Sequence, residues 1–458
     1  MRIVVLGRGI SGLAAAHLLG RAGHDVVSID PATDAGGLIH SERIDGFLCE
    51  TGPQALLDGP AETRALVTEA GLEARLVGAL PGARRRFIHA RGRLHALPTN
   101  PIALARSGLL GWRGKLRLLR EPFVRGAAPE GDESVLAFGT RRFGEETARA
   151  LLAPAVIGIY AGDAAQLSVQ SALPRLAAFE RAHGSVIRGV LAQRRAGGRM
   201  GKPVSFPDGL QELARALDQR LGARRIVARA ERIDRGADGG DRGGGAWRVT
   251  LTGGHAPVDA DAVVIATSAA PAAALLDPIA PAAARALRSV RLAPAVVVSL
   301  GFHAGGADLG IDLHAYGFLV ARDDHAAAAG AERTAVLGCQ YESSIFPRRA
   351  PPGAVLLRAI LGGTFDPGII DESDDAIGAR VVADLGRLAG LSRQPDFIRV
   401  WKHRDGIPQY ELGHAAKVAA ADADLARHPG LHLIGHTLRG VGINDCIATA
   451  AALARQIA

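Results

Sequence analysis

The chain has 458 residues, of which 48% are hydrophobic and 22% are charged, a composition that excludes an intrinsically disordered protein and predicts two or three domains. No apolar run reaches the ~18 residues of a transmembrane helix, so we expect no membrane span. The net charge of +8 suits a membrane surface or an acidic ligand. The sequence carries no common nucleic-acid-binding motif, so nucleic acid is not an expected partner.

The first thirty residues predict a βαβ unit. A strand over residues 2–6 leads into a helix that runs to residue 22, and a second strand ends on Asp30. Between strand and helix lies a G-x-G-x-x-G fingerprint, formed by Gly7, Arg8, Gly9, Ile10, Ser11 and Gly12. In dinucleotide-binding folds such glycines let a pyrophosphate approach the backbone at the start of the helix, and an acidic residue placed like Asp30 binds the ribose hydroxyls. Because the chain opens on this strand, we expect no signal peptide and a cytoplasmic location.

The rest of the chain predicts a mixed part, a helical part and a second mixed part. We expect a helix over 61–78, a hairpin over 84–97 with its turn at Arg91 and Gly92, and mostly helices from 101 to 196. A Gly/Asp-rich loop at 236–245 is expected to join two strands. Strands are expected at 224–228, 247–251, 262–266, 295–300, 318–320, 356–361 and 431–434, before a final helix from residue 445. The three cysteines, Cys49, Cys339 and Cys446, have the spacing of neither a metal site nor a redox pair, so we expect free thiols and no metal.

Three later segments favour FAD over NAD as the dinucleotide. Gly36 and Gly37 follow Asp30 at the place where flavoproteins of the amine oxidase group have a second glycine pair. Residues 50–53 resemble the segment that passes near the flavin in that group. Residues 434–436 and 439–445 resemble its C-terminal flavin segment, where backbone N–H groups at a helix start face the isoalloxazine ring and stabilise negative charge on it.

Over nearly its whole length the chain resembles the protoporphyrinogen oxidase family of flavoproteins. The resemblance lies in residues 9–15, 86–88, 92–98, 159–163, 167–168, 205–210, 406–410, 412–414 and 440–447. It implies an α/β plus α+β architecture in which two domains are inserted into a Rossmann-type FAD-binding domain. The expected ranges are 1–60, 200–266 and 429–458 for the FAD-binding domain, 61–100 and 267–428 for the substrate-binding domain, and 101–199 for a helical, membrane-associated domain.

The resemblance also implies an activity and a substrate site. The activity is the FAD-dependent six-electron oxidation of a porphyrinogen to a porphyrin in haem biosynthesis, with O2 as acceptor and H2O2 as product. A substrate propionate is expected to pair with Arg86, with Arg84 and Arg85 as adjacent alternatives, because a guanidinium binds a carboxylate through two hydrogen bonds. The apolar clamp on the macrocycle maps to Gly317 and Leu319 on one side and Ile360 on the other, with ordinary strand core as the alternative interpretation.

The implied cofactor contacts extend beyond the glycine fingerprint. They comprise Gly7, Arg8, Gly9, Ile10, Ser11, Gly12, Asp30, Pro31, Gly36, Gly37, Leu38, Gly52, Pro53, Gln54, Ala55, Ile233, His436, Val441, Gly442 and Ile443. We assign no side chain as a general base, because hydride passes directly to the flavin, and we expect His414, His436 and Asp445 to be structural.

Some residues depart from the family pattern. Arg8 replaces a usual glycine, and its side chain is expected to point outward. Asp30 replaces a usual glutamate and reaches the ribose with one carbon less. Leu38 and His436 also stand where other residue types are frequent.

A basic amphipathic segment over 101–120 combines leucines and Trp112 with five cationic side chains. Such a segment suits a membrane surface, while a solvated helix face over its own core is the alternative. The family's helical domain is associated with membrane attachment, which implies a peripheral position on the inner face of the cell membrane. A ferrochelatase and a second copy of the chain are further implied partners.

Three alternative functions stay open from the sequence. The first is oxidation of coproporphyrinogen III, which carries two more propionates. The second is another amine oxidase-like flavoenzyme, such as a carotenoid desaturase. The third is a flavin-binding protein without turnover.

Overall fold

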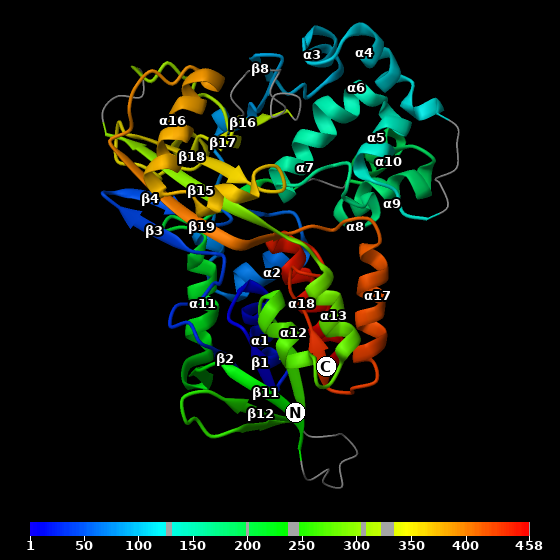
Figure 1. The fold of residues 1–458 in the computed structure, drawn as a ribbon, viewed down its shortest axis with the longest axis vertical. Coiled ribbons are helices and arrows are strands. Elements are labelled where there is room, and N and C mark those ends of the chain that lie inside the picture. The colour runs from blue at the N-terminus through cyan, green and yellow to red at the C-terminus, as the bar shows by residue number, and fades with distance from the viewer. Residues whose placement is uncertain (125–130, 198–200, 237–246, 304–307, 322–333, 458) are drawn as a thin grey trace.

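A computed structural model describes residues 1–124, 131–197, 201–236, 247–303, 308–321 and 334–457. Its lower half is built around a five-stranded parallel sheet (Figure 1). In spatial order the strands are β10 (Arg225–Val227), β2 (Asp25–Asp30), β1 (Arg2–Leu6), β14 (Ala262–Ile265) and β20 (Leu431–Leu433). Both chain ends lie in this half, so segments far apart in the sequence form one sheet.

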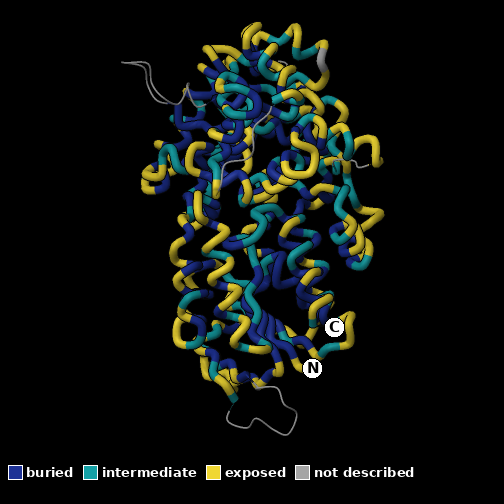
Figure 2. Tube along the Cα trace, turned by 90° about the vertical axis from the view of Figure 1, so that its right-hand side faces the viewer, coloured by how far each residue is buried: buried dark blue, intermediate teal, exposed yellow. Residues whose placement is uncertain are grey.

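The side chains of β1 alternate between the two faces of this sheet, and other elements cover both faces. Ile3 and Val5 pack into one core with the helices α1 (Ile10–Arg21), α2 (Ala61–Glu69), α11 (Gln211–Leu221) and α18 (Ile443–Ile457). Val4 and Leu6 pack into a second core, formed with β11 (Ala230–Arg235), β12 (Trp247–Leu251), β13 (Val258–Ala260), α12 (Ala269–Leu276), α13 (Pro281–Ser289) and α17 (His414–Leu425). Figure 2 shows the buried backbone concentrated along the middle of this half. Continuous apolar strands are typical of parallel sheets buried on both faces.

The upper half contains a seven-stranded mixed sheet. Its order is β19 (Phe397–Pro408), β15 (Leu292–Phe302), β18 (Val355–Gly362), β17 (Val336–Gln340), β16 (Gly317–Val320), β7 (Phe87–Ala90) and β8 (Arg93–Ala96). All neighbouring pairs are antiparallel except β16 with β7. Helix α16 (Asp374–Ala389) packs on one face of this sheet through an apolar core. The opposite face of the sheet is not covered by α16.

Three small sheets and a helical part complete the described fold. One sheet is formed by β11, β12 and β13. The others are β3 (Ser41–Ile44) with β4 (Phe47–Glu50), and β5 (Leu56–Leu57) with β9 (Pro203–Ser205) and β6 (Val77–Gly78). The helical part contains α3 (Pro101–Arg106), α4 (Trp112–Leu119), α5 (Val135–Phe143), α6 (Glu145–Thr147), α7 (Ala153–Tyr160), α8 (Val169–Ala172), α9 (Pro174–His183) and α10 (Val186–Arg195). Within the described ranges, no helix is both long and apolar enough to cross a membrane.

Most sequence-based expectations about elements are confirmed. In the hairpin turn, Arg91 and Gly92 both have positive φ (54° and 72°), the geometry that favours tight two-residue connections. All three cysteines are free and buried. The expected helix over 61–78 is wrong beyond Glu69: Gly71 takes a φ of 76° and ends α2. A short 3-10 turn follows over Glu73–Arg75, and Val77 and Gly78 pair with β9. The loop expected at 236–245 lies, apart from residue 236, outside the described residues. The division into three domains at the boundaries given above stays a prediction.

Candidate active site

The glycine loop lies at the carboxyl end of β1, where ligands bind in open parallel sheets. Gly7 has a φ of 104°, and a Cβ on it would lie 2.7 Å from the carbonyl oxygen of Ala266. A Cβ on Gly12 would lie 1.9 Å from the carbonyl oxygen of Gly7, so the helix packs against the turn only without a side chain here. A Cβ on Gly9 would meet nothing within 4 Å. The loop is therefore close-packed on its inner side and open above Gly9, as a pyrophosphate-binding turn requires.

The second glycine pair lies directly against this loop. The Gly36 N–H donates to the carbonyl oxygen of Arg8 at 2.9 Å, and Gly36 forms an isolated bridge with Gly9. A Cβ on Gly37 would lie 3.2 Å from the Cα of Gly9. Gly36 and Gly37 both have positive φ, 125° and 61°. The structure thus brings the two glycine motifs of the sequence into one backbone surface.

Asp30 ends β2 beside this surface, and Arg8 holds it. The Arg8 N–H donates to one carboxylate oxygen of Asp30 at 2.7 Å, and the Ala32 N–H donates to the other at 2.8 Å. The expectation that the Arg8 side chain points outward is wrong. Its side chain is only 1% exposed, because the guanidinium turns inward to the carboxylate of Asp218 on α11, at 2.9 Å.

The C-terminal segment closes the same edge of the sheet. After β20 the chain passes through Gly435 and His436 and reaches α18, where the Gly442 N–H donates to the Asp445 carboxylate at 3.2 Å. The His436 carbonyl accepts the Tyr410 hydroxyl, and the His414 ring bonds the Leu438 carbonyl at 2.9 Å. The side chains of His414 and Asp445 therefore hold backbone, and His436 takes part through its own carbonyl. That none of the three acts as a general base stays a prediction.

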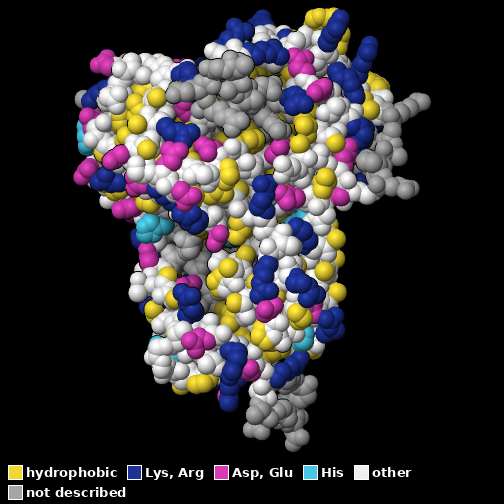
Figure 3. Space-filling view, viewed as in Figure 1, with side chains coloured by type: hydrophobic (Ala, Val, Ile, Leu, Met, Phe, Trp, Pro, Cys, Tyr) yellow, Lys and Arg dark blue, Asp and Glu magenta, His cyan; other side chains and the backbone are white. Residues whose placement is uncertain are grey.

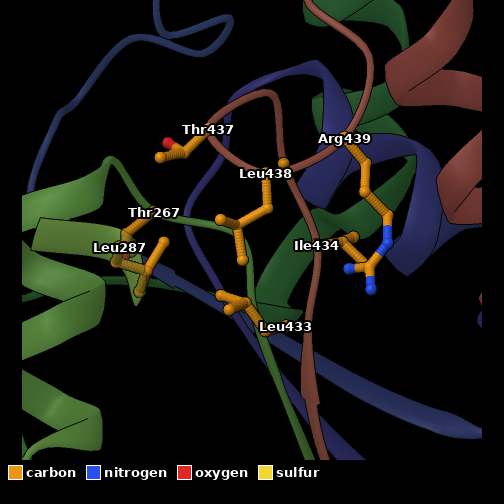
Figure 4. A pocket seen from close by; sticks show the side chains of 8 residues that line it. Thr267, Leu287, Leu433, Ile434, Thr437, Leu438 and Arg439 are labelled. Atoms are coloured by element: carbon orange, nitrogen blue, oxygen red, sulfur yellow. The ribbon is translucent and has the colours of Figure 1, made fainter. Parts of the chain in front are cut away.

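A small pocket marks the carboxyl ends of β14 and β20. Figure 4 shows Leu438, from the loop after β20, among Leu287, Leu433 and Ile434, with Thr267 from the loop after β14 nearby. The pocket is much too small for a dinucleotide or a macrocycle. It belongs to the packing of the C-terminal segment on the sheet, and the glycine loop remains the expected ligand-binding surface.

A buried polar cluster ties residues 50–54 to the upper sheet. The Glu50 carboxylate pairs with Arg349 at 2.6 Å, and both side chains are at most 1% exposed. From β18, Arg358 donates to the Glu50 carbonyl at 3.1 Å and to the Gly52 carbonyl. With its amide turned to suit its neighbours, Gln54 donates to the Glu342 carboxylate at 3.0 Å. Burial raises the pKa of Glu342, and its charged neighbours Arg349 and Arg358 only partly oppose this.

The residues expected to clamp the substrate share one face of the upper sheet. Directly paired residues lie on the same face, and the pairs run from Gly317 to Gln340, from Leu319 to Gly338, and from Gly338 on to Ile360. Leu319 and Ile360 are half-buried, whereas their neighbours Phe318, Val320, Ala359 and Leu361 belong to the core under α16. Arg358 lies two residues from Ile360 and so on the same face, and it reaches the carbonyls of residues 50 and 52. The face that carries Gly317, Leu319 and Ile360 is therefore turned toward the segment expected beside the flavin.

The three adjacent arginines have different partners. Arg85 pairs with Asp312 at 3.0 Å. Arg86 is exposed and lies over the Tyr316 ring, 4.7 Å from its centroid, and Tyr316 directly precedes Gly317. Within the described part of the chain, neither Arg84 nor Arg86 has a carboxylate at salt-bridge distance. The Tyr316 ring thus fixes the direction of the Arg86 side chain. Its guanidinium lies at the edge of the candidate site and has no carboxylate partner among the described residues.

The remaining expected cofactor residues lie around the same edge. Ile10 and Ser11 are buried in the first turn of α1, and Ile233 is buried on β11. Pro31, Leu38 and Pro53 are exposed, and Ala55 is half-buried. Val441 and Ile443 flank Gly442 at the start of α18. These positions fit a dinucleotide lying across the sheet edge, but each contact stays a prediction.

Sequence reasoning missed the polar cluster. Glu342, Arg349 and Arg358 were not singled out, although Arg358 is a lone charge within the apolar strand Val355–Gly362. A buried charge is costly unless it is paired, so that position was a signal for a functional or inter-domain contact. The carbonyls of residues 50 and 52 that Arg358 binds are 308 and 306 residues away in the sequence, and periodicity gives no hint of them.

The parallel sheet, the paired glycine motifs at its carboxyl edge and the converging C-terminal segment define a flavoprotein that binds FAD through a Rossmann-type domain. The open backbone above Gly9 and the fixed carboxylate of Asp30 fit this cofactor. The chain belongs to the family of flavin-containing amine oxidoreductases, whose family model matches residues 10–458. It is an FAD-dependent oxidoreductase.

Named relatives cover almost all of the chain. It is 28% identical to the coproporphyrinogen III oxidase of Bacillus subtilis (strain 168), over 97% of this chain and 95% of that protein. It is 33% identical to the protoporphyrinogen oxidase of Homo sapiens, over 97% of this chain and 96% of that protein. A solved structure from Exiguobacterium sp. 255-15, provisionally named a protoporphyrinogen oxidase, superposes with a TM-score of 0.82 at 26% identity, covering 100% of this chain and 98% of that one. Putrescine oxidase structures share the fold, with a TM-score of 0.73 at 16% identity.

Proposed function

We propose that this protein oxidises protoporphyrinogen IX to protoporphyrin IX in haem biosynthesis. The reaction removes six hydrogens from the substrate in three two-electron steps, and three O2 molecules accept them as three H2O2. One observation carries the proposal: the half-buried face with Gly317, Leu319 and Ile360 is turned toward the flavin segment and has the free guanidinium of Arg86 at its edge. Apolar walls with a cation at the rim suit a flat, apolar tetrapyrrole that carries carboxylates on one side.

The protein's part in this chemistry is binding and orientation. FAD supplies the hydride acceptor when bound. Arg86 binds a propionate and so fixes which edge of the macrocycle points outward. Leu319 and Ile360 hold the macrocycle against the flavin segment and exclude water.

Porphyrin fluorescence in air tests the proposal directly. Purified holoprotein is given protoporphyrinogen IX, and porphyrin formation is followed together with O2 consumption. We expect three O2 consumed per porphyrin formed and turnover far above the spontaneous rate. A flavin-loaded protein that forms no porphyrin from any porphyrinogen contradicts the proposal.

Oxidation of coproporphyrinogen III is the second candidate, and a specific observation favours it. Arg84 as well as Arg86 lacks a carboxylate partner among the described residues, and two free guanidiniums suit a substrate with two additional propionates. Comparing kcat/KM for the two porphyrinogens on the same sample decides between them.

We further propose that the helical part attaches the protein to a membrane surface. The large apolar side chains of α4 and its flanks are exposed: Ile102, Trp112, Leu116, Leu119 and Phe123 are 45–76% exposed. Cationic side chains gather at the same end of the molecule, as Figure 3 shows at its upper right, where α3 and α4 lie in Figure 1. Exposed apolar groups among cations suit insertion beneath anionic headgroups. The inner face of the cell membrane is the surface proposed, with a ferrochelatase and a second copy of the chain as further proposed partners.

Flotation with liposomes tests this attachment. We expect the protein to float with vesicles that contain anionic lipid at low salt, and Trp112→Ser combined with Phe123→Ser to stay at the bottom. Leu191→Ser, an exposed leucine on α10, is the matched control and should float like the unchanged protein. Failure of the unchanged protein to float contradicts membrane attachment and leaves the proposed reaction untouched.

A further inference from the structure

Arg8 and Asp30, two residues at which the nucleotide loop departs from the family pattern, are bonded to each other. The Asp30 carboxylate accepts two backbone N–H groups, one on each oxygen: Arg8 at 2.7 Å and Ala32 at 2.8 Å. Each oxygen keeps a further acceptor position, which is what the two hydroxyls of a ribose need. The direction in which Asp30 presents them depends on where these two N–H groups are held.

The Arg8 side chain connects these two donors. One terminal nitrogen of its guanidinium donates to the carbonyl oxygen of Ala32, so the side chain of the first donor holds the backbone of the second. The other donates to Asp218 on α11 at 2.9 Å. Asp218 is 8% exposed and also accepts a hydrogen bond from Arg225 of β10 at 2.7 Å, so it is a well-anchored partner. The guanidinium thus cross-links the start of the glycine loop, the loop after β2 and α11.

We propose that Arg8 is a positioning residue for the adenosine half of FAD. Its buried side chain fixes the Asp30 carboxylate in the orientation that receives the ribose hydroxyls. Asp30 needs such support because its side chain has one carbon and one rotatable bond fewer than that of glutamate. Its carboxylate therefore has less freedom to move to the ribose hydroxyls. The loop that it shares with Ala32 is exposed from residue 31 to residue 34, so without the cross-link the cofactor would have to order this loop on binding. The inference rests on FAD binding and is independent of the porphyrinogen.

A merely structural role for Arg8 makes a different prediction. If the guanidinium only fills space beneath the loop, its loss weakens the whole fold and therefore both halves of the cofactor site. If it positions Asp30, its loss weakens recognition of adenosine and leaves recognition of the isoalloxazine half intact. ADP and FMN are probes for the two halves.

The experiment compares apoprotein variants by isothermal titration calorimetry with ADP and by flavin fluorescence with FMN and FAD. For Arg8→Gly and for Asp218→Asn we expect about tenfold weaker binding of ADP and FAD, with FMN affinity unchanged. Both variants break a buried ion pair and should lower the unfolding midpoint of the apoprotein, so binding is measured well below that midpoint. Arg225→Met removes only the outer partner of Asp218 and is the control, with ADP affinity expected to stay as in the unchanged protein. Arg8→Lys keeps the charge but replaces the rigid fork, whose two nitrogens bond Asp218 and Ala32 separately, by one flexible ammonium, so it should also weaken ADP binding.

Unchanged ADP affinity in a folded Arg8→Gly protein overturns the proposal. Parallel losses of ADP affinity and FMN affinity also overturn it, because they indicate a general packing role. If Arg8→Gly does not fold, Arg8→Lys decides by the same criteria. Where FMN alone binds too weakly to measure, Arg349→Met serves as a variant that breaks a buried ion pair elsewhere. Loss of ADP affinity in Arg8→Gly but not in Arg349→Met supports the proposal, and equal loss in both overturns it.

Discussion

Helix α1 contains two glycines, and only one of them is required by close packing. Gly12 faces the turn before the helix, where a Cβ would lie 1.9 Å from a backbone oxygen, whereas a Cβ on Gly20 would meet nothing within 4 Å. We expect Gly12→Ala to abolish FAD retention, since the helix must move away from the loop to admit a methyl group. Gly20→Ala is the control on the same helix and should stabilise the protein by about 0.5–1 kcal/mol, because alanine favours helix. Flavin absorbance after purification and the thermal unfolding midpoint measure the two outcomes.

Substitution of Arg86 tests the proposed contact between its guanidinium and a substrate propionate. Removal of one charge-assisted hydrogen bond pair at a partly exposed site costs about 1.4 kcal/mol, so Arg86→Ala should raise KM for the porphyrinogen about tenfold with little change in kcat. Arg85→Ala is the control, because Arg85 is already paired with Asp312. The dimethyl ester of the porphyrinogen lacks the carboxylates, and its KM should be equal for Arg86→Ala and the unchanged enzyme. A loss that is equally large with the ester would remove Arg86 from propionate binding.

At the level of elements, one buried histidine, His414, and two half-buried ones, His432 and His436, surround β20. His432 lies in the strand, His436 follows it, and His414 opens α17. Burial lowers the pKa of all three below the ordinary value of 6.5. The unfolded chain therefore binds protons more readily than the folded protein does. The contribution of these histidines to the free energy of unfolding should be at its maximum above pH 6.5 and decrease as the pH falls below 6.5. Urea unfolding at pH 7.5 and at pH 5.5 measures the loss, and His414→Gln should reduce its size.

Elements with strong local patterns could be predicted from sequence, and elements stabilised by distant partners could not. The βαβ unit, the hairpin at residues 84–97 and the apolar strands β14 and β18 follow from periodicity and turn residues alone. Strand β19 was missed because its charged residues, such as Lys402 and Arg404, break the apolar alternation, and its stability comes from pairing along β15. The helix predicted through residue 78 failed for the same reason, since pairing of Val77 with β9 overrides helix propensity.

The residues of the candidate site divide in the same way, into those with a recognisable local pattern and those that depend on distant partners. The glycine motifs identified themselves by spacing and context, and the resemblance supplied Arg86, Gly317, Leu319 and Ile360. The inward direction of Arg8 was not predictable, because its partner Asp218 is 210 residues away and is an ordinary helix residue in the sequence.

At the scale of the whole molecule, the buried pair Glu50–Arg349 joins the flavin segment to the upper part of the fold. Arg349→Met leaves the Glu50 carboxylate without its partner in a site that excludes water, so we expect a loss of about 3–5 kcal/mol in the free energy of unfolding. Arg288→Ala breaks an exposed pair with Asp277 and is the control, with no measurable change expected. Urea titration of both variants checks this, and equal midpoints for the two would contradict a joining role for Glu50.

The parallel sheet takes its edge strand β20 from residues 431–433 and covers α1 with α18, which ends at residue 457. On the ribosome, β14 therefore emerges with one edge unpaired and α1 with one apolar face uncovered, and both stay so until the last segment of the chain is synthesised. The nascent chain has a nucleotide loop long before it has a complete flavin site. A complete FAD site therefore forms only after residues 431–457 have left the ribosome, and until then β14 and α1 expose surfaces that a chaperone can protect.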